Sequence, residues 1–266
     1  MEKRKCSCTA IVLAAGSGRR MKSDTAKQYM ELCGRPVVCH CLQAFQDSPV
    51  IDHIILAVGA GEEARVREQI VDRYGFCKVE AVLEGGAERY LSVSRALSAA
   101  EEMGFAGDGG YLFIHDGARP FVSKKIIEDT YETAAAYGAC CAAVPVKDTI
   151  KAADGNGFVE RTLDRSRLFS IQTPQVFAAP LILEAYRLLT LRQEELVRAG
   201  VHITDDAMVV ESMLKHPVKL VEASGGNIKI TTPEDMELAE FLASRIARCE
   251  KKSTCKKNLK KSEKSC

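Results

Sequence analysis

The sequence contains no apolar run near the roughly 18 residues that a membrane helix requires. It also lacks an apolar N-terminal segment that ends in a small-residue cleavage site, so we expect no signal peptide. The 11 cysteines include no C-x-x-C pair of the kind that binds zinc, and we interpret them as reduced thiols. These absences favour a cytoplasmic protein that does not enter the membrane.

A large surplus of charge of one sign is absent too, because the 266 residues carry a formal charge of only +1. Positive charge is concentrated in the tail, residues 249–266, where seven lysines stand against two glutamates. The rest of the chain is therefore mildly acidic and offers no basic face to nucleic acid. We expect a disordered Lys-rich tail, a basic lead over residues 1–8 and a single domain over residues 9–248.

Short apolar stretches without charge alternate along the chain with longer amphipathic stretches. This alternation predicts an α/β, Rossmann-like fold in which helices flank a mainly parallel sheet. Ligands bind such sheets at the carboxyl ends of the strands, so the loops after Ala15 and His115 should meet at one crevice. Strands are predicted over residues 9–15, 53–58, 79–83, 111–115 and 140–146, and helices over 36–45, 62–74, 88–103, 124–137 and from about 232.

The alternation breaks over residues 147–171. Short β-like stretches at 149–151 and 158–163 flank a D-G and an N-G pair, which favour a hairpin turn. The pattern predicts a β-arm that projects from the domain. Because two strands alone are only marginally stable, we expect a second copy of the chain to pack on this arm and form a homodimer.

The loop after the first strand, Leu13–Met21 (LAAGSGRRM), combines glycines with basic residues. Gly16 and Gly18 allow the backbone to approach a ligand closely, and exposed amides in such a loop bind phosphate oxygens. Arg20 and Lys27 add the positive charge that a triphosphate requires. The loop matches neither the Walker pattern nor the dinucleotide pattern G-x-G-x-x-G. An ordinary glycine turn with solvated arginines remains the alternative.

Asp116 follows the fourth predicted strand, at the expected edge of the crevice. A carboxylate in this place can hold Mg²⁺ against phosphate oxygens. Arg119 could fix a neighbouring loop or a substrate, and a helix cap or structural ion pair is the alternative reading of Asp116. His115 is interpreted as structural, because the sequence gives it no catalytic partner.

Three further segments give weaker signals. Glycines near Arg89 and Ser92 suit the close approach of a base or sugar, and Lys229 follows paired glycines and could reach a phosphate. Each segment could equally be an ordinary structural loop. Thr204 could cap a helix or contact a ligand.

These segments occur in the order found in one enzyme family. The set comprises LAAGSGRRM, Lys27-Gln28, HDGARPF, Val146–Thr149, Asp164-Arg165, Gln172–Gln175, Thr204–Asp206 and Asn227–Lys229. In these motifs the chain resembles the 2-C-methyl-D-erythritol 4-phosphate cytidylyltransferases of the non-mevalonate isoprenoid pathway. The resemblance implies a nucleotide-diphospho-sugar transferase type of fold. It also implies transfer of CMP from CTP to 2-C-methyl-D-erythritol 4-phosphate, giving 4-diphosphocytidyl-2-C-methyl-D-erythritol and pyrophosphate.

The resemblance implies a role for each matching residue. Arg20 and Lys27 would stabilise charge on the triphosphate, and Lys229 would neutralise the α-phosphate or the attacking phosphate. Arg165 would reach the substrate phosphate in the other subunit, and Asp116 would hold Mg²⁺ or another divalent cation. Substrate-binding positions would be Ala14, Ala15, Gly16, Gly18, Gly85, Arg89, Ser92, Arg119, Thr149 and Thr204, with Gly16, Gly85, Arg89 and Ser92 around the cytosine and its ribose.

Two alternatives accompany this interpretation. D-ribitol 5-phosphate cytidylyltransferases share the glycine loop, but Ala118 and the Asp164-Arg165 pair favour the erythritol substrate. An inactive nucleotide-binding scaffold is a remote alternative, because the charged residues of the proposed site are all present. One departure from the family pattern is Gly226, whose backbone freedom could loosen Lys229.

Overall fold

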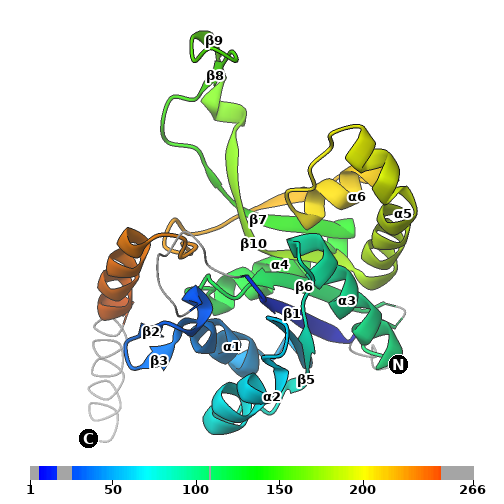
Figure 1. Cartoon of the computed structure of the whole chain (residues 1–266), viewed down its shortest axis with the longest axis vertical. Helices are drawn as coiled ribbons and strands as arrows, with labels where there is room; N and C mark the ends of the chain where they lie inside the picture. The colour runs from blue at the N-terminus through cyan, green and yellow to red at the C-terminus, as the bar shows by residue number, and fades with distance from the viewer. Residues whose placement is uncertain (1–5, 17–25, 108, 247–266) are drawn as a thin grey trace, which may run out of the picture.

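The computed structural model describes residues 6–16, 26–107 and 109–246. In these parts, seven strands form one sheet in the order β11-β7-β10-β6-β1-β4-β5 (Figure 1). Neighbours are parallel except at β10, which pairs antiparallel with both β6 and β7. The strands are β1 Cys8–Ala14, β4 His53–Val58, β5 Val79–Glu84, β6 Tyr111–Asp116, β7 Ala139–Pro145, β10 Phe169–Ala178 and β11 Lys219–Glu222.

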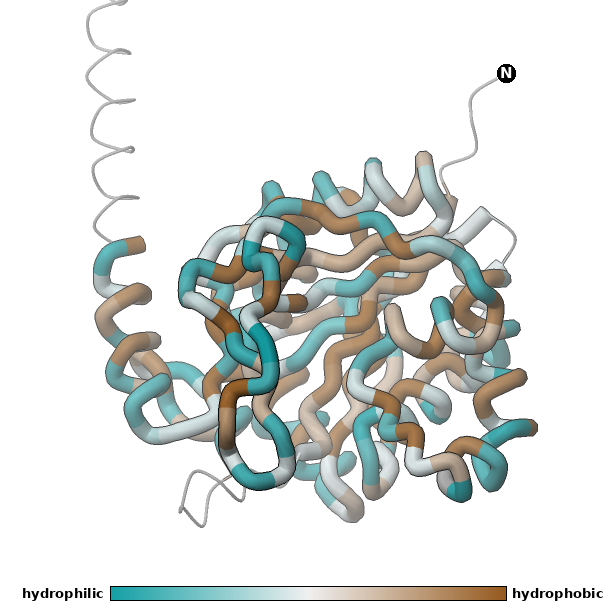
Figure 2. The backbone as a smooth tube through the Cα atoms, turned by 90° about the horizontal axis from the view of Figure 1, so that it is seen from above, coloured by the Kyte–Doolittle hydropathy of each residue, from teal (hydrophilic) through white to brown (hydrophobic). Residues whose placement is uncertain are grey.

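Helices cover both faces of this sheet. Alternate residues of β1 point to opposite faces, so Ala10 and Val12 join the hydrophobic core under α1, α2 and α4, whereas Ile11 joins the core under α3, α5 and α6. Figure 2 shows hydrophobic residues along the central strands. The helices are α1 Val37–Asp47, α2 Glu63–Val66, α3 Arg89–Glu102, α4 Lys124–Tyr137, α5 Ala179–Arg198 and α6 Asp206–Leu214, and the short β2 Glu31–Leu32 and β3 Arg35–Pro36 pair with each other.

The predicted fold class is confirmed, and the predicted strands and helices up to residue 146 are all present. The helix at 124–137 and the strand at 53–58 have the predicted bounds. The stretch 62–74 is less regular than predicted, because α2 passes into a π-helical segment, η3 Arg67–Asp72. A last described helix spans 233–246, close to the predicted start. Its entry is fixed by the Asp235 carboxylate, which accepts hydrogen bonds from the Thr231 and Thr232 backbone N–H groups.

Strands β10 and β11 were absent from the prediction. β10 lies inside the sheet, between β7 and β6, although the middle of the strand has the polar sequence Gln172-Thr173-Pro174-Gln175. The strand begins at Phe169, which the sequence analysis had assigned to the arm. The Gln172, Thr173 and Gln175 side chains are buried, and each has a polar partner there. A buried strand of this composition has no apolar periodicity, which explains why the sequence pattern did not reveal it.

The segment between β7 and β10 extends away from the sheet as an arm (Figure 1). It carries the hairpin of β8 Lys151–Ala153 and β9 Val159–Thr162, followed by the 3₁₀ turn η4 Arg165–Arg167. β8 begins two residues later than the predicted stretch. Phe158 and Val159 on this arm are 73% and 61% exposed.

No helix in the described ranges has the length and apolar character needed to cross a bilayer.

Candidate functional site

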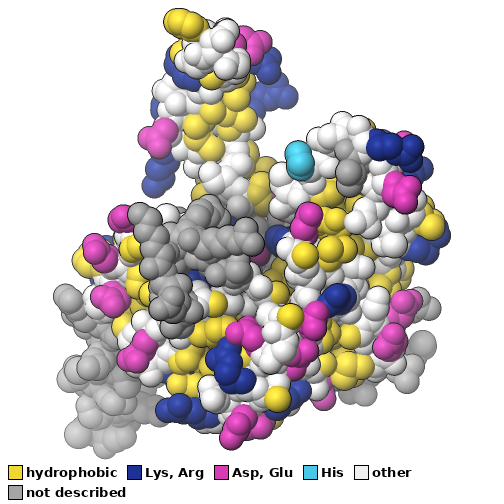
Figure 3. Space-filling view, viewed as in Figure 1, with side chains coloured by type: hydrophobic (Ala, Val, Ile, Leu, Met, Phe, Trp, Pro, Cys, Tyr) yellow, Lys and Arg dark blue, Asp and Glu magenta, His cyan; other side chains and the backbone are white. Residues whose placement is uncertain are grey.

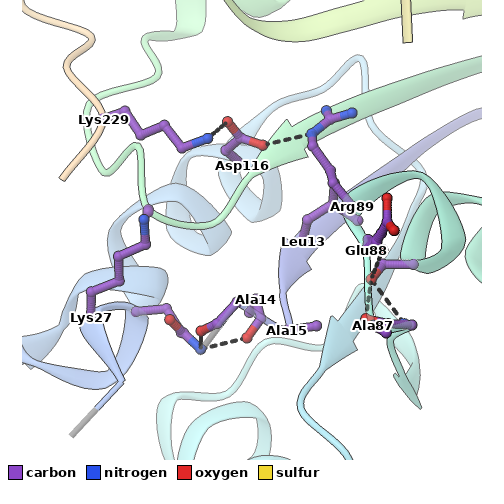
Figure 4. A pocket seen from close by; sticks show the side chains of 14 residues that line it. Leu13, Ala14, Ala15, Lys27, Ala87, Glu88, Arg89, Asp116 and Lys229 are labelled. Atoms are coloured by element: carbon purple, nitrogen blue, oxygen red, sulfur yellow. Dashed lines mark hydrogen bonds and ion pairs between the residues drawn. The ribbon is translucent and has the colours of Figure 1, made fainter. Parts of the chain in front are cut away.

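The carboxyl ends of β1 and β6 lie side by side, with Leu13 opposite Asp116 in the parallel register. A cavity of about 500 Å³, which we call the main pocket, opens there (Figure 4). The prediction that the loops after Ala15 and His115 meet at one crevice is therefore confirmed. Eight predicted site residues line the main pocket: Ala14, Ala15, Gly16, Lys27, Arg89, Ser92, Asp116 and Lys229.

A second cavity of about 280 Å³, the smaller pocket, adjoins the main pocket. The two cavities share Arg89, Asp116 and Lys229, so these three residues mark the boundary between them. The predicted residues Arg119 and Thr204 line the smaller pocket, together with Gln172, Thr173, Gln175 and Asp205.

At this boundary between the pockets, three cationic side chains surround the Asp116 carboxylate. The Lys229 ammonium lies 2.7 Å from Oδ2, the Arg89 guanidinium 3.3 Å from Oδ1, and the Arg119 Nε 3.8 Å from Oδ2. Burial by itself would raise the pKa of Asp116, but the cations Arg89, Lys229 and Arg119 outweigh burial and hold this pKa well below its usual range. Asp116 is therefore a carboxylate at any physiological pH.

Arg89 joins Asp116 to a second buried carboxylate. Its two terminal nitrogens donate to the oxygens of Asp206 at 2.9 and 2.7 Å, in the bidentate geometry typical of arginine. The Tyr186 hydroxyl donates to the same carboxylate at 2.6 Å. The Arg89 side chain therefore bridges two carboxylates on the pocket wall, and contact with a ribose stays a prediction.

The wall of the main pocket next to β1 is held by Gln28 and Ser92. The Gln28 amide donates to the backbone carbonyls of Ala14 and Gly16 at 2.6 and 3.1 Å, and its side chain is buried. Gly86 N–H donates to the Ser92 hydroxyl at 2.9 Å. These bonds fix the two loops between which the main pocket opens.

Lys229 is held by the segment before it. Asn227 donates from its side-chain amide to Gln172 Oε1 at 3.0 Å and to the Thr173 carbonyl at 2.9 Å. Its own backbone carbonyl accepts a hydrogen bond from Arg119 at 2.9 Å. These contacts anchor the chain two residues before Lys229, so the freedom expected at Gly226 is limited by its neighbour.

The remaining predicted residues lie elsewhere. Gly85 lies behind the main pocket, where its N–H donates to the Val58 carbonyl at 2.7 Å. Thr149 and Arg165 are exposed on the arm and line neither pocket, and Arg165 donates to the Lys147 carbonyl at 2.9 Å. Gly18 and Arg20 are outside the described residues.

Sequence reasoning assigned no role to several residues of the site. Gln175 accepts hydrogen bonds from the N–H groups of Asp206 and Ala207 and donates to Asp205, so it fixes the start of α6. Thr173 accepts the Asp116 N–H at 3.1 Å. Both belong to the motif Gln172–Gln175, which was a signal of importance. For Tyr186, which binds Asp206, the sequence held no such signal.

A site for a divalent cation needs oxygen donors. Across the described ranges, no group of three or more His, Cys, Asp or Glu side chains is arranged to hold a metal ion. The ionised Asp116 at the pocket boundary fits a cation held by one carboxylate and completed by substrate phosphates, which is how proteins commonly hold Mg²⁺.

Comparison with known proteins identifies the family. Residues 8–245 match the family model IspD, described as 2-C-methyl-D-erythritol 4-phosphate cytidylyltransferase. A relative of that name from Lachnospira eligens is 48% identical over 231 residues, covering 87% of this chain and 96% of its own. One from Alkaliphilus oremlandii is 46% identical over 232 residues, covering 87% and 93%.

Solved structures agree with the relatives. A 4-diphosphocytidyl-2C-methyl-D-erythritol synthase from Anaerococcus prevotii is 31% identical, with a TM-score of 0.73 and coverage of 90% of this chain and 97% of that one. A 2-C-methyl-D-erythritol 4-phosphate cytidylyltransferase from Francisella tularensis is also 31% identical, with a TM-score of 0.72 and coverage of 89% and 99%. The chain therefore belongs to the 2-C-methyl-D-erythritol 4-phosphate cytidylyltransferase family.

Proposed function

We propose that this protein transfers CMP from CTP to 2-C-methyl-D-erythritol 4-phosphate, releasing pyrophosphate, as a step in isoprenoid precursor synthesis. The observation that carries the proposal is the pair of adjoining pockets with Arg89, Asp116 and Lys229 at their boundary. Two phosphorylated substrates need such an arrangement, because their phosphates must meet while their other parts stay apart. Family membership supports the choice of these two substrates.

In this proposal CTP occupies the main pocket and the erythritol phosphate occupies the smaller one. An oxygen of the second substrate's phosphate forms a bond to the α-phosphorus of CTP, while the bond from that phosphorus to the bridging oxygen of pyrophosphate breaks. No protein nucleophile takes part, so catalysis rests on positioning and charge stabilisation. Lys27 and Lys229 lie on the same side of the main pocket (Figure 4), where negative charge would increase.

Asp116 would hold a divalent cation, with Mg²⁺ as the expected metal. The cation, when bound, supplies positive charge to the triphosphate. Asp116 itself keeps Lys229 at the pocket boundary through the 2.7 Å ion pair. Arg20 would add charge from the glycine loop, as its place in the motif suggests. The enzyme would work in the cytoplasm, where thiols stay reduced.

The β-arm would join two copies of the chain. Phe158, Val159, Phe169 and Ile171 are exposed hydrophobic residues on or next to the arm, which Figure 3 shows standing clear of the body. Exposed apolar side chains on a two-stranded hairpin favour a partner that covers them. Arg165 and Thr149 lie on this arm away from both pockets of their own chain, so they would serve the site of the partner.

The proposed activity is tested by pyrophosphate release from the purified protein with CTP and Mg²⁺. We expect strong preference for 2-C-methyl-D-erythritol 4-phosphate over D-ribitol 5-phosphate, and loss of turnover when the metal is chelated. Preference for the ribitol phosphate would instead identify the protein as a D-ribitol 5-phosphate cytidylyltransferase. Turnover of neither compound, in a folded protein, would remove the proposal.

A mixed dimer tests the arm. Arg165→Ala should raise the KM for the erythritol phosphate more than the KM for CTP. We expect Arg165→Ala and Asp116→Asn, each poorly active alone, to recover activity when co-expressed with different tags. A hybrid dimer would then hold one site with both native residues, so an equal mixture should regain about a quarter of the wild-type sites. A mixture no more active than its two components would place Arg165 outside the partner's site.

Gly85→Ala should impair CTP binding. An added Cβ would lie 2.4 Å from the Cβ of Ala15, 2.8 Å from the Ser92 hydroxyl oxygen and 3.2 Å from the Val58 carbonyl. Ala15 and Ser92 line the main pocket, and both would have to shift. Overpacking of this kind costs about 1–3 kcal/mol, and the lower part of this range corresponds to a KM for CTP raised about tenfold. Gly107→Ala is the matched control, because open space surrounds that position. An unchanged KM for CTP in Gly85→Ala would show that this wall does not contact the nucleotide.

A further inference from the structure

His115 lies at the end of β6 with its ring fully enclosed, at 0% exposure. Both ring nitrogens have partners that belong to the site. Nε2 lies 3.1 Å from the backbone carbonyl of Arg119, and Nδ1 lies 3.0 Å from the hydroxyl oxygen of Thr173. The ring of Phe45 contacts the imidazole edge-on, with 5.1 Å between ring centroids. The imidazole therefore connects two residues that line the smaller pocket.

The partners determine which nitrogen carries the proton. The Arg119 carbonyl can only accept a hydrogen bond, so Nε2 must donate to it. In the neutral ring Nδ1 is then an acceptor, and the Thr173 hydroxyl donates to it. A lone pair of the same hydroxyl oxygen remains to accept the Asp116 N–H at 3.1 Å.

Each hydrogen bond in this series has a defined donor and a defined acceptor. The chain runs from the Arg119 carbonyl through the imidazole and the Thr173 hydroxyl to the Asp116 N–H, and it passes behind the boundary between the pockets. The same turn is closed by the bond from Arg119 N–H to the Asp116 carbonyl at 2.9 Å. Displacing the ring would therefore move Arg119, Thr173 and Asp116 together.

We propose that His115 is a positioning residue that fixes Arg119 and Thr173 around the second substrate and orients Asp116 between the two pockets. The inference rests on the proposed function, since it assigns the smaller pocket to the erythritol phosphate. It departs from the sequence interpretation of His115 as merely structural. The hydrogen bonds of the imidazole go to Arg119 and Thr173, which line the smaller pocket, so the effect should fall on the second substrate.

Two substitutions each remove one of the two hydrogen bonds of the imidazole and keep the other. His115→Asn keeps an acceptor near the position of Nδ1 and loses the donor to Arg119. His115→Gln keeps a donor near the position of Nε2 and loses the acceptor for Thr173. We expect each to lower kcat/KM for the erythritol phosphate about 10- to 100-fold, as for the loss of a buried hydrogen-bond partner that orients a site. The KM for CTP should change less than about threefold, because the wall at Gly16 and Ser92 stays in place.

Thr173→Val shows whether the ring acts through the hydroxyl. Combined with His115→Gln it should add only the loss of the acceptor for the Asp116 N–H, because the bond to the ring is already broken. Combined with His115→Asn it should add that loss and the loss of the bond to the ring. Equal effects of Thr173→Val in both backgrounds would overturn the proposal. Phe45→Leu is the packing control, expected to lower Tm by a few °C with kcat/KM retained. A loss of kcat/KM in Phe45→Leu equal to that of the His115 variants would contradict the proposal, because packing alone would then explain the effect of His115.

A second measurement does not depend on turnover. The ¹⁵N spectrum of the histidine rings, assigned by the signal lost in His115→Gln, should show His115 protonated at Nε2 alone at pH 7. A proton at Nδ1 would overturn the bond directions and the proposal with them. Wild-type protein that releases no pyrophosphate would remove the proposed function, while this spectrum would still test the chain of bonds.

Discussion

Replacing Asp116 with asparagine is expected to lower kcat/KM about 1,000-fold. The substitution keeps the shape of the side chain and removes the charge to which Lys229, Arg89 and Arg119 are paired. It also removes the carboxylate proposed to hold the divalent cation. Loss of a single preorganised electrostatic group costs about 10²–10³ in rate, and Asp116 orients two such groups. The measurement is steady-state pyrophosphate release with each substrate varied in turn.

The same substitution should destabilise the fold. Removing one member of a buried ion pair costs about 3–5 kcal/mol, and we expect the low end because Lys229 and Arg89 are 35% and 28% exposed. The depressed pKa of Asp116 determines how this contribution to the stability of the fold changes with pH. A depressed carboxyl pKa stabilises the fold above the unfolded value, about 3.9, and this stabilisation is lost only as pH falls toward the folded pKa.

Thermal unfolding at a series of pH values measures this pH dependence of stability. The Tm difference between wild type and Asp116→Asn should be constant above about pH 5 and shrink below about pH 4. A difference that already disappears between pH 5 and 6 would mean that the pKa of Asp116 is not depressed. Asp47→Asn is the control, because that carboxylate is exposed and accepts a hydrogen bond from the Gln43 amide at the surface. It should leave both kcat/KM and Tm nearly unchanged.

Much of this site followed from the sequence because its parts are local. Lys27 and Gln28 stand together in one motif, and Asp116 follows directly on an apolar strand. Parallel strands bring such loops to one edge of the sheet, so the sequence predicted that the loops after Ala15 and His115 meet there. The cavity between them confirms that reasoning.

The polar network behind the site could not be predicted in this way. Arg89 and Asp206 are separated by 117 positions, and no local pattern relates them. β10 was missed because the buried Gln172, Thr173 and Gln175 interrupt the apolar pattern that marks a core strand. Their polarity is instead explained by their partners, since each satisfies a backbone group of another site segment. Sequence periodicity reveals packing against apolar neighbours, and it cannot reveal hydrogen bonds between distant segments.

Lys27→Ala is expected to lower kcat/KM by about 10³-fold or more, mainly through kcat. The structure places Lys27 in the short 3₁₀ turn η2 Lys27–Tyr29, with its side chain extending into the main pocket (Figure 4). The turn is anchored by the two residues that follow Lys27. Gln28 binds the Ala14 and Gly16 carbonyls, and the Tyr29 hydroxyl donates to Glu62 at 2.9 Å. An ammonium held on such a rigid turn can stabilise charge without reorganising during the reaction.

This anchoring allows the effect on catalysis to be separated from an effect on folding. Lys27→Ala leaves the anchors at Gln28 and Tyr29 intact, so Tm should stay within about 2 °C of the wild type. Lys27→Arg keeps the charge and should recover part of kcat, but a planar guanidinium does not reproduce a compact ammonium. Lys125→Ala removes an exposed lysine paired with Asp129 on α4 and should change neither quantity. Unchanged turnover in a folded Lys27→Ala protein would exclude Lys27 from the reaction and leave Lys229 as the described lysine that serves the phosphates.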